Sequence, residues 1–149
     1  MTTSDYYIQD NTDIEEKKLE AAKSLFQAGN YSGALKLYLD MVNTSYSYKL
    51  NFEVGRCYYK LNDFDNAEEY FMRSVSLERF KNPSFVFLGN IFYKREDISK
   101  AIECWCTAYS YKPEDESVCL NLATSYFSKD MKFQSVIFCR FAVACNLFL

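Results

Sequence analysis

The feature that most constrains the fold is a set of landmark residues that recurs every 33 to 34 positions. Each copy has a small residue followed three positions later by an aromatic residue or a leucine. Further along, three copies have an alanine, and a large aromatic residue stands four positions after that alanine. The small positions are Ala22, Gly55, Gly89 and Ala123; the alanines are Ala34, Ala67 and Ala101; the aromatic residues are Tyr38, Phe71 and Trp105. Several landmarks in phase predict an array of one repeated unit.

The stretch 82–113 shows what the unit is. Apolar residues at helical spacing predict two helices, with a polar turn between them that ends at Asp97, a suitable N-cap for the second helix. A proline stands in the first turn of the pair, and another stops the second helix. We interpret the small size of Gly89 and Ala101 as a packing requirement. Antiparallel helices approach closely only where side chains are short, and large residues then fill the neighbouring holes.

The same pattern predicts helix pairs in the other copies. The helices are expected near 15–28 and 31–43, near 48–61 and 64–78, and near 115–128 and 132–147. The repeats are predicted at about 14–47, 48–81, 82–114 and 115–149, after a polar, acidic and flexible tail over residues 1–13. The fourth copy departs from the pattern, with Ser135 at the alanine position and Cys139 in place of the aromatic residue. Phe133 also stands one residue later than its equivalents, so an irregular turn is expected near 130–132.

This pattern resembles the tetratricopeptide repeat family over about residues 14–149. The resemblance implies an all-α fold, a right-handed superhelix of about four antiparallel helix pairs. It also implies a function, because the first helices of such repeats line a concave groove that takes a peptide or a partner segment. A protein–protein interaction scaffold or adaptor is thus the favoured function. The alternative is a small client-specific or secretion-type chaperone.

Helical phase selects the residues that would face such a groove. The predicted peptide-binding residues are Lys23, Phe26, Phe52, Arg56, Tyr59, Lys60, Phe87, Asn90, Tyr93, Lys94, Asn121 and Phe127. Four aromatic residues at equivalent positions would form a row, with packing in the core between repeats as the alternative. Asn90 and Asn121 would pair with peptide groups, since an amide side chain both donates and accepts. The basic residues among the set favour an acidic partner.

One subclass of the family can be tested directly. Its co-chaperones hold the C-terminal carboxylate of heat-shock proteins with a clamp of Lys, Asn, Asn, Lys and Arg. The corresponding positions here are Leu19, Lys23, Glu53, Pro83 and Phe87. Only Lys23 is basic, and Glu53 would repel a carboxylate. The clamp is therefore predicted to be absent.

The residues needed for catalysis or metal binding are scarce. The chain has no histidine, no C-x-x-C spacing and no glycine-rich phosphate loop, so no enzyme activity, cofactor or metal site is predicted. A net charge of −3 argues against nucleic-acid binding, which needs a basic face. Four cysteines on or beside apolar faces, Cys57, Cys104, Cys119 and Cys139, are predicted to be buried reduced thiols.

The two ends of the chain suggest a cytoplasmic protein. The N-terminus lacks the features of a signal peptide, and the longest apolar run, 137–149, is too short for a membrane span. The predicted last helix is apolar nearly all round, so it is expected to be covered. Three explanations stay open: the native chain continues, the end folds on itself locally, or two copies pair as a homodimer. The residues proposed for self-association are Phe138, Phe141, Leu147 and Phe148.

Overall fold

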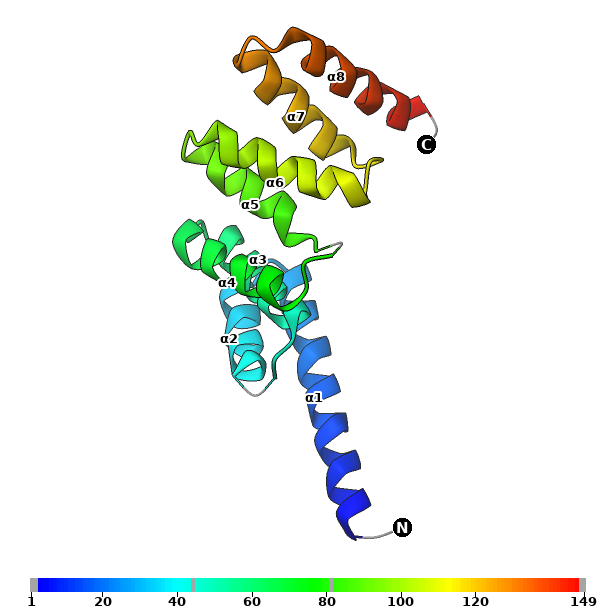
Figure 1. Cartoon of the computed structure of the whole chain (residues 1–149). Helices are drawn as coiled ribbons and strands as arrows, with labels where there is room; N and C mark the ends of the chain where they lie inside the picture. The colour runs from blue at the N-terminus through cyan, green and yellow to red at the C-terminus, as the bar shows by residue number, and fades with distance from the viewer. Residues whose placement is uncertain (1–2, 44, 81, 148–149) are drawn as a thin grey trace. The chain divides into compact units, whose positions relative to one another are not determined.

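The computed structural model describes the backbone of residues 3–43, 45–80 and 82–147, and side chains between residues 14 and 140 (Figure 1). These residues form helices and no strand, as the sequence predicts. The helices are α1 (Thr3–Gln27), α2 (Tyr31–Val42), α3 (Tyr48–Lys60), α4 (Phe64–Leu77), α5 (Ser84–Lys94), α6 (Ile98–Tyr111), α7 (Glu116–Ser128) and α8 (Lys132–Leu147).

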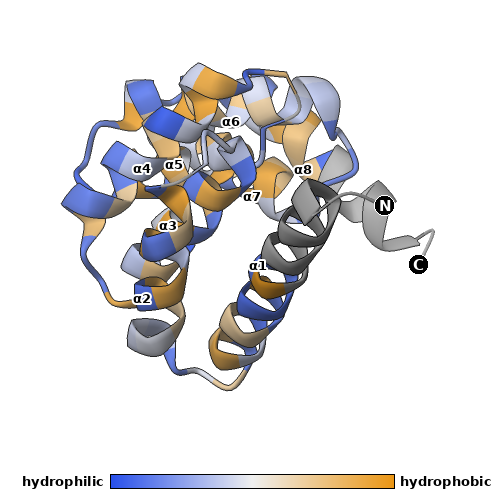
Figure 2. Cartoon of the chain, turned by 90° about the horizontal axis from the view of Figure 1, so that it is seen from below, coloured by the Kyte–Doolittle hydropathy of each residue, from blue (hydrophilic) through white to orange (hydrophobic). Residues whose placement is uncertain are grey.

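The chain divides into two compact units, Met1–Leu77 and Glu78–Leu149. In the first unit α1 packs on α2, α2 on α3 and α3 on α4. In the second unit α5 packs on α6, α6 on α7 and α7 on α8. Each unit therefore contains two helix pairs. Along the coloured parts of the helices in Figure 2, hydrophobic and hydrophilic stretches alternate, as expected for helices that bury one face.

Each pair is closed by the same three-residue turn, which has one residue in the left-handed region. These residues are Gly29, Asn62, Glu96 and Asp130, with φ of 80°, 63°, 62° and 57°. In the fourth turn the backbone N–H of Asp130 donates to Phe127, and that of Met131 donates to Tyr126, as at the other three turns. This is the Schellman arrangement, which satisfies the last carbonyls of a helix. The irregular turn expected near 130–132 is therefore wrong.

The small landmark residues make room for the large ones. A Cβ atom built on Gly55 would lie 2.7 Å from the Phe71 ring, and one built on Gly89 would lie 2.4 Å from Nε1 of Trp105. Phe71 and Trp105 are fully buried, as are Ala34, Ala67 and Ala101. The predicted close approach of the two helices is confirmed in the second and third pairs, where the aromatic residue packs directly on the glycine.

The helix starts follow the predicted chemistry. Asp97 accepts a hydrogen bond from the backbone N–H of Lys100 (3.2 Å), so its predicted capping role is confirmed. Asp115 caps α7 in the same way, accepting from Val118 (3.4 Å). Such caps satisfy backbone donors that have no partner within the helix.

Helix α1 is longer than predicted. It begins at Thr3, so the boundary expected near residue 15 is wrong, whereas the other stated boundaries agree within one residue. The physical reason is that no glycine or proline interrupts residues 3–27. Extending an existing helix adds one hydrogen bond per residue and needs no new nucleus. That residues 1–13 are flexible stays a prediction, and their side chains lie outside the described residues.

Among the described helices, none is both long enough and apolar enough to span a membrane.

Candidate functional site

In the first unit, the predicted groove residues of α1 and α3 meet around one arginine. The Arg56 guanidinium lies 4.3 Å from the centre of the Phe26 ring and 5.7 Å from that of Phe52. It also makes an ion pair with Glu53 (2.9 Å). Burial raises the pKa of Glu53, although the Arg56 charge acts to lower it. The positive charge of Arg56 is thus paired with a carboxylate within the first unit.

The aromatic residues of this unit are partly core residues. Phe26 packs edge-on against Tyr31 (5.1 Å between ring centres), and Tyr59 packs in the same way on Phe64 (5.5 Å). Phe52 contacts Phe71. All three predicted site residues are half-buried, whereas Lys23 and Lys60 are exposed. The half-burial of these rings is therefore compatible with both predicted roles, lining a groove and packing in the core.

In the second unit, α5 and α7 are joined by two asparagines. The indole N–H of Trp105 donates to Oδ1 of Asn90 (3.2 Å), and Nδ2 of Asn121 donates to the same oxygen (3.2 Å). Trp105 comes from α6, so three helices position this group. The sequence predicts each asparagine as a peptide-binding residue but does not predict the bond between them. No periodic signal reveals it, because the two residues stand at different positions of their repeats.

Three large apolar side chains on α5 and α7 are exposed. They are Phe127 (67% exposed), Leu120 (47%) and Tyr93 (41%). Tyr93 also contacts Trp105, with 5.7 Å between the ring centres. The other predicted residues are Phe87, which is half-buried, and Lys94, which is exposed. We call the surface formed by Asn90, Tyr93, Leu120, Asn121 and Phe127 the α5–α7 face.

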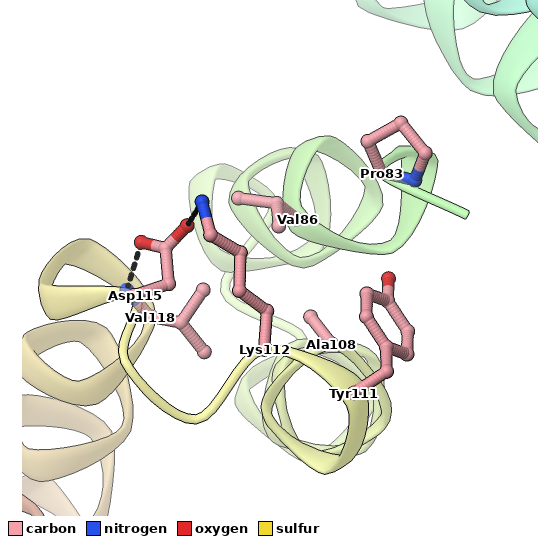
Figure 3. Close-up of a pocket in the computed structure, with 7 residues that line it drawn as sticks. All are labelled: Pro83, Val86, Ala108, Tyr111, Lys112, Asp115 and Val118. Atoms are coloured by element: carbon pink, nitrogen blue, oxygen red, sulfur yellow. Dashed lines mark hydrogen bonds and ion pairs between the residues drawn. The ribbon is translucent and has the colours of Figure 1, made fainter. Parts of the chain in front are cut away.

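A cavity that the sequence does not predict lies beside this face. Its volume is about 300 Å³, and its lining residues are Pro83, Val86, Ala108, Tyr111, Lys112, Asp115 and Val118 (Figure 3). They come from the start of α5, the end of α6 and the start of α7. Because the lining residues hold different positions in their repeats, periodicity gives no sign of the cavity.

The structure describes only part of the predicted self-association surface. Phe138 stacks on Tyr126 (5.6 Å between ring centres) and meets Tyr109 edge-on (5.3 Å), so it packs inward. The exposed apolar residues of α8 within the described part are Phe133 and Val136 instead. The side chains of Phe141, Leu147 and Phe148 lie outside the described residues. The homodimer and the chaperone function stay predictions.

The described cysteines differ in how far they are buried. Cys57 and Cys119 are buried, as predicted, and burial raises the pKa of Cys57 to about 12. Cys104 is half-buried, whereas Cys139 is exposed, so its predicted burial is wrong. Cys139 faces outward because α8 has no further described helix packed on that side. No group of three or more His, Cys, Asp or Glu side chains suited to a metal occurs within the described residues.

The sequence of one helix pair matches a known repeat family. A sequence model of the tetratricopeptide repeat matches residues 48–80, which span α3 and α4. The same pairing of a small residue with a large one recurs in α5 and α6. Residues 48–80 are a tetratricopeptide repeat. The predicted family and all-α fold class are thereby confirmed.

Two relatives are similar to part of this chain. BBSome complex member BBS4 of Bos taurus is 28% identical over 108 residues, which make up 72% of this chain and 21% of BBS4. The chain thus spans about a fifth of that relative. An NADPH oxidase activator of Dictyostelium discoideum is 31% identical over 86 residues, 58% of this chain and 14% of that protein.

Two solved structures share the fold. The crystal structure of MamA superposes with a TM-score of 0.81 at 17% identity, covering 95% of this chain and 84% of MamA. PilF of Pseudomonas aeruginosa has a TM-score of 0.77 at 13% identity, covering 91% of this chain and 62% of PilF. At these identities the likeness concerns the fold class, an all-α solenoid of helix pairs.

Proposed function

We propose that this chain is a protein–protein interaction module, a scaffold or adaptor, that binds an extended partner segment along its α5–α7 face. The hydrogen-bonded pair of Asn90 and Asn121 is the observation that carries the proposal. The similarity to BBS4 supports it, because BBS4 is a member of the BBSome complex.

The orientation of the two amides follows from the tryptophan. An indole N–H can only donate, so the Asn90 atom that faces Trp105 must be the oxygen. Asn121 must then donate to that oxygen with its nitrogen. Within the described residues, the nitrogen of Asn90 and the oxygen of Asn121 have no other hydrogen-bond partner. One donor and one acceptor are thus available, as a peptide group requires.

The neighbouring surface suits the side chains of a bound segment. Phe127, Leu120 and Tyr93 are exposed on the same two helices, and aromatic residues are enriched at the centres of protein interfaces. Their burial on binding would be favourable, because apolar area is removed from water. The amide pair would then orient the segment, and the apolar side chains would supply contact area.

In the first unit, two of the predicted basic groove residues already pair with carboxylates. Arg56 pairs with Glu53 at 2.9 Å, and Lys23 lies 3.6 Å from Glu20. An acidic segment bound at Arg56 or Lys23 would have to compete with these carboxylates. The acidic partner that the sequence favours stays a prediction.

A peptide-display experiment tests this function. Random peptides are selected on the purified chain, and the dissociation constants of selected peptides are measured by fluorescence anisotropy. Asn121→Ala is expected to weaken binding by roughly tenfold, the effect of losing a hydrogen bond to a desolvated peptide group. Phe127→Ala should weaken it as well. Glu103→Ala, on the exposed side of α6, is the matched control and should have no effect.

Thermal melting first shows that each variant is folded. Selected peptides that bind Asn121→Ala and Phe127→Ala as tightly as the unchanged chain would refute binding along the α5–α7 face. Failure to select any peptide that competes with its own unlabelled form would refute the proposed function as a whole.

A further inference from the structure

The cavity beside the α5–α7 face has an apolar lining. Figure 3 shows Val86 on α5 and Val118 on α7 beside the same space, with Ala108 and Tyr111 of α6 closing it. The aliphatic stem of Lys112 adds further apolar surface. At about 300 Å³, the cavity lies at the lower end of the ~300–1,000 Å³ range of small-molecule pockets. Its size suits a single large side chain better than a cofactor.

The polar groups that line the cavity already have partners. The Lys112 ammonium makes an ion pair with Asp115 (3.3 Å). The other carboxylate oxygen of Asp115 accepts from the Ser117 hydroxyl (2.6 Å) and the Val118 backbone N–H (3.4 Å). The Tyr111 hydroxyl donates to the backbone oxygen of Asn82. A polar ligand group that enters among the valine and alanine side chains would lose water without a hydrogen-bond partner there, which is costly. Donors remain available only on the exposed ammonium of Lys112 at the edge of the cavity. The lining therefore selects an apolar group.

The position of the cavity connects it to the asparagine pair. Val86 is four residues before Asn90 on α5, and Val118 is three residues before Asn121 on α7. Residues at these spacings share one face of a helix. Four residues correspond to about 6 Å along a helix axis, and an extended chain covers about that length in two residues. A segment held by the two amides would therefore place a side chain over the cavity about two residues away.

We propose that this cavity is a specificity pocket that receives one aliphatic side chain of the bound segment, of the size of leucine, isoleucine or methionine. The proposal rests on the proposed function, because it takes the segment to be held at the asparagine pair. The asparagines would bind any sequence, since they recognise the backbone. The pocket would decide which sequences bind tightly.

A double-mutant experiment tests the pocket with the display-selected peptides. Alanine scanning of a selected peptide should reveal one aliphatic position whose truncation weakens binding about tenfold or more. Val86→Phe, which fills the cavity, should cause a similar loss with the original peptide. It should cause little further loss with the truncated peptide, because both changes remove the same contact. Equal effects of Val86→Phe on the two peptides would overturn the proposal.

A second variant keeps the test valid if Val86→Phe does not fold. Val86→Ala enlarges the cavity, and it should reverse the preference at the anchor position from leucine towards phenylalanine. An unchanged order of preference would overturn the pocket. The two proposals fail separately: Asn121→Ala should weaken peptides with either anchor residue. Loss of affinity in Asn121→Ala, with no effect of either Val86 variant, would leave the proposed function standing and refute the pocket alone.

Discussion

At the scale of the residue, the four helix-pair turns use the same backbone with different side chains. The left-handed position is occupied by Gly29, Asn62, Glu96 and Asp130. The left-handed conformation costs about 1–2 kcal/mol for most L-residues, and least for glycine, asparagine and aspartate. Glu96 is therefore the least suited of the four. It is exposed, so solvent replaces any contact that its side chain would lose.

Glu96→Gly is expected to stabilise the chain by roughly 0.5–1 kcal/mol. The relief of left-handed strain should exceed the additional entropy that glycine gives to the unfolded chain. Urea denaturation measures the free energy of unfolding. The matched control is Glu103→Gly, an exposed position within α6, which should destabilise the chain by about 1 kcal/mol. Destabilisation by both changes would contradict the strain argument.

At Gly89, which lies beneath Trp105, an added side chain is expected to destabilise the fold. A Cβ at Gly89 would lie 2.4 Å from Nε1 of the buried indole, so Gly89→Ala should destabilise the chain by about 1–3 kcal/mol. In the first repeat the equivalent residues are alanine and tyrosine, Ala22 and Tyr38. The cost of Gly89→Ala should therefore be smaller in a Trp105→Tyr background. Equal costs in both backgrounds, measured by denaturation, would show that the clash with the indole is not responsible.

At the scale of the element, Asp115 links the cap of α7 to an ion pair with Lys112. Burial acts to raise the pKa of Asp115. Hydrogen bonds from Ser117, Val118 and Lys112, together with the Lys112 charge, outweigh it and hold the pKa below its usual value. A carboxyl group with a lowered folded-state pKa stabilises the fold above its unfolded pKa. That contribution is lost as the pH falls through the folded pKa.

Asp115→Ala should therefore cost about 1 kcal/mol near neutral pH, the usual effect of losing a cap. Asp115→Asn should cost less, because asparagine is an equally good cap and only the charge is lost. The difference in stability between the unchanged chain and Asp115→Asn should shrink as the pH falls below about 4. Chemical denaturation at several pH values measures this. A difference that does not depend on pH would exclude the carboxylate charge as its source.

At the scale of the whole molecule, the sequence predicts the parts of the fold that repeat and misses those that occur once. Helix boundaries follow from landmarks that each repeat restates, such as Gly89 beneath Trp105. The start of α1 has no such landmark. The regular turn at Asp130 could not be predicted from the altered Ser135. The backbone of this turn depends on its left-handed residue and not on the side chain at position 135. The bond between Asn90 and Asn121 and the adjacent cavity depend on three helices meeting, which spacing along one helix does not describe.

Both units should lose stability in alkali for a common reason. Burial raises the pKa of Tyr38 in the first unit and of Tyr111 in the second unit to about 12, from an ordinary value near 10. A buried tyrosine stays protonated in the folded chain while the unfolded chain ionises. The stabilising contribution is therefore complete below pH 10 and is lost as the pH rises from 10 to 12.

The free energy of unfolding should accordingly fall above pH 10. Tyr38→Phe, which keeps the ring and removes the titrating hydroxyl, should make the fall less steep by up to about 1.4 kcal/mol per pH unit. Below pH 9 the two chains should show the same pH dependence. Urea denaturation between pH 8 and 12 measures the slopes, and tyrosinate absorbance of the urea-unfolded chain supplies the unfolded pKa. Parallel curves above pH 10 would mean that Tyr38 ionises in the folded chain as easily as in the unfolded one.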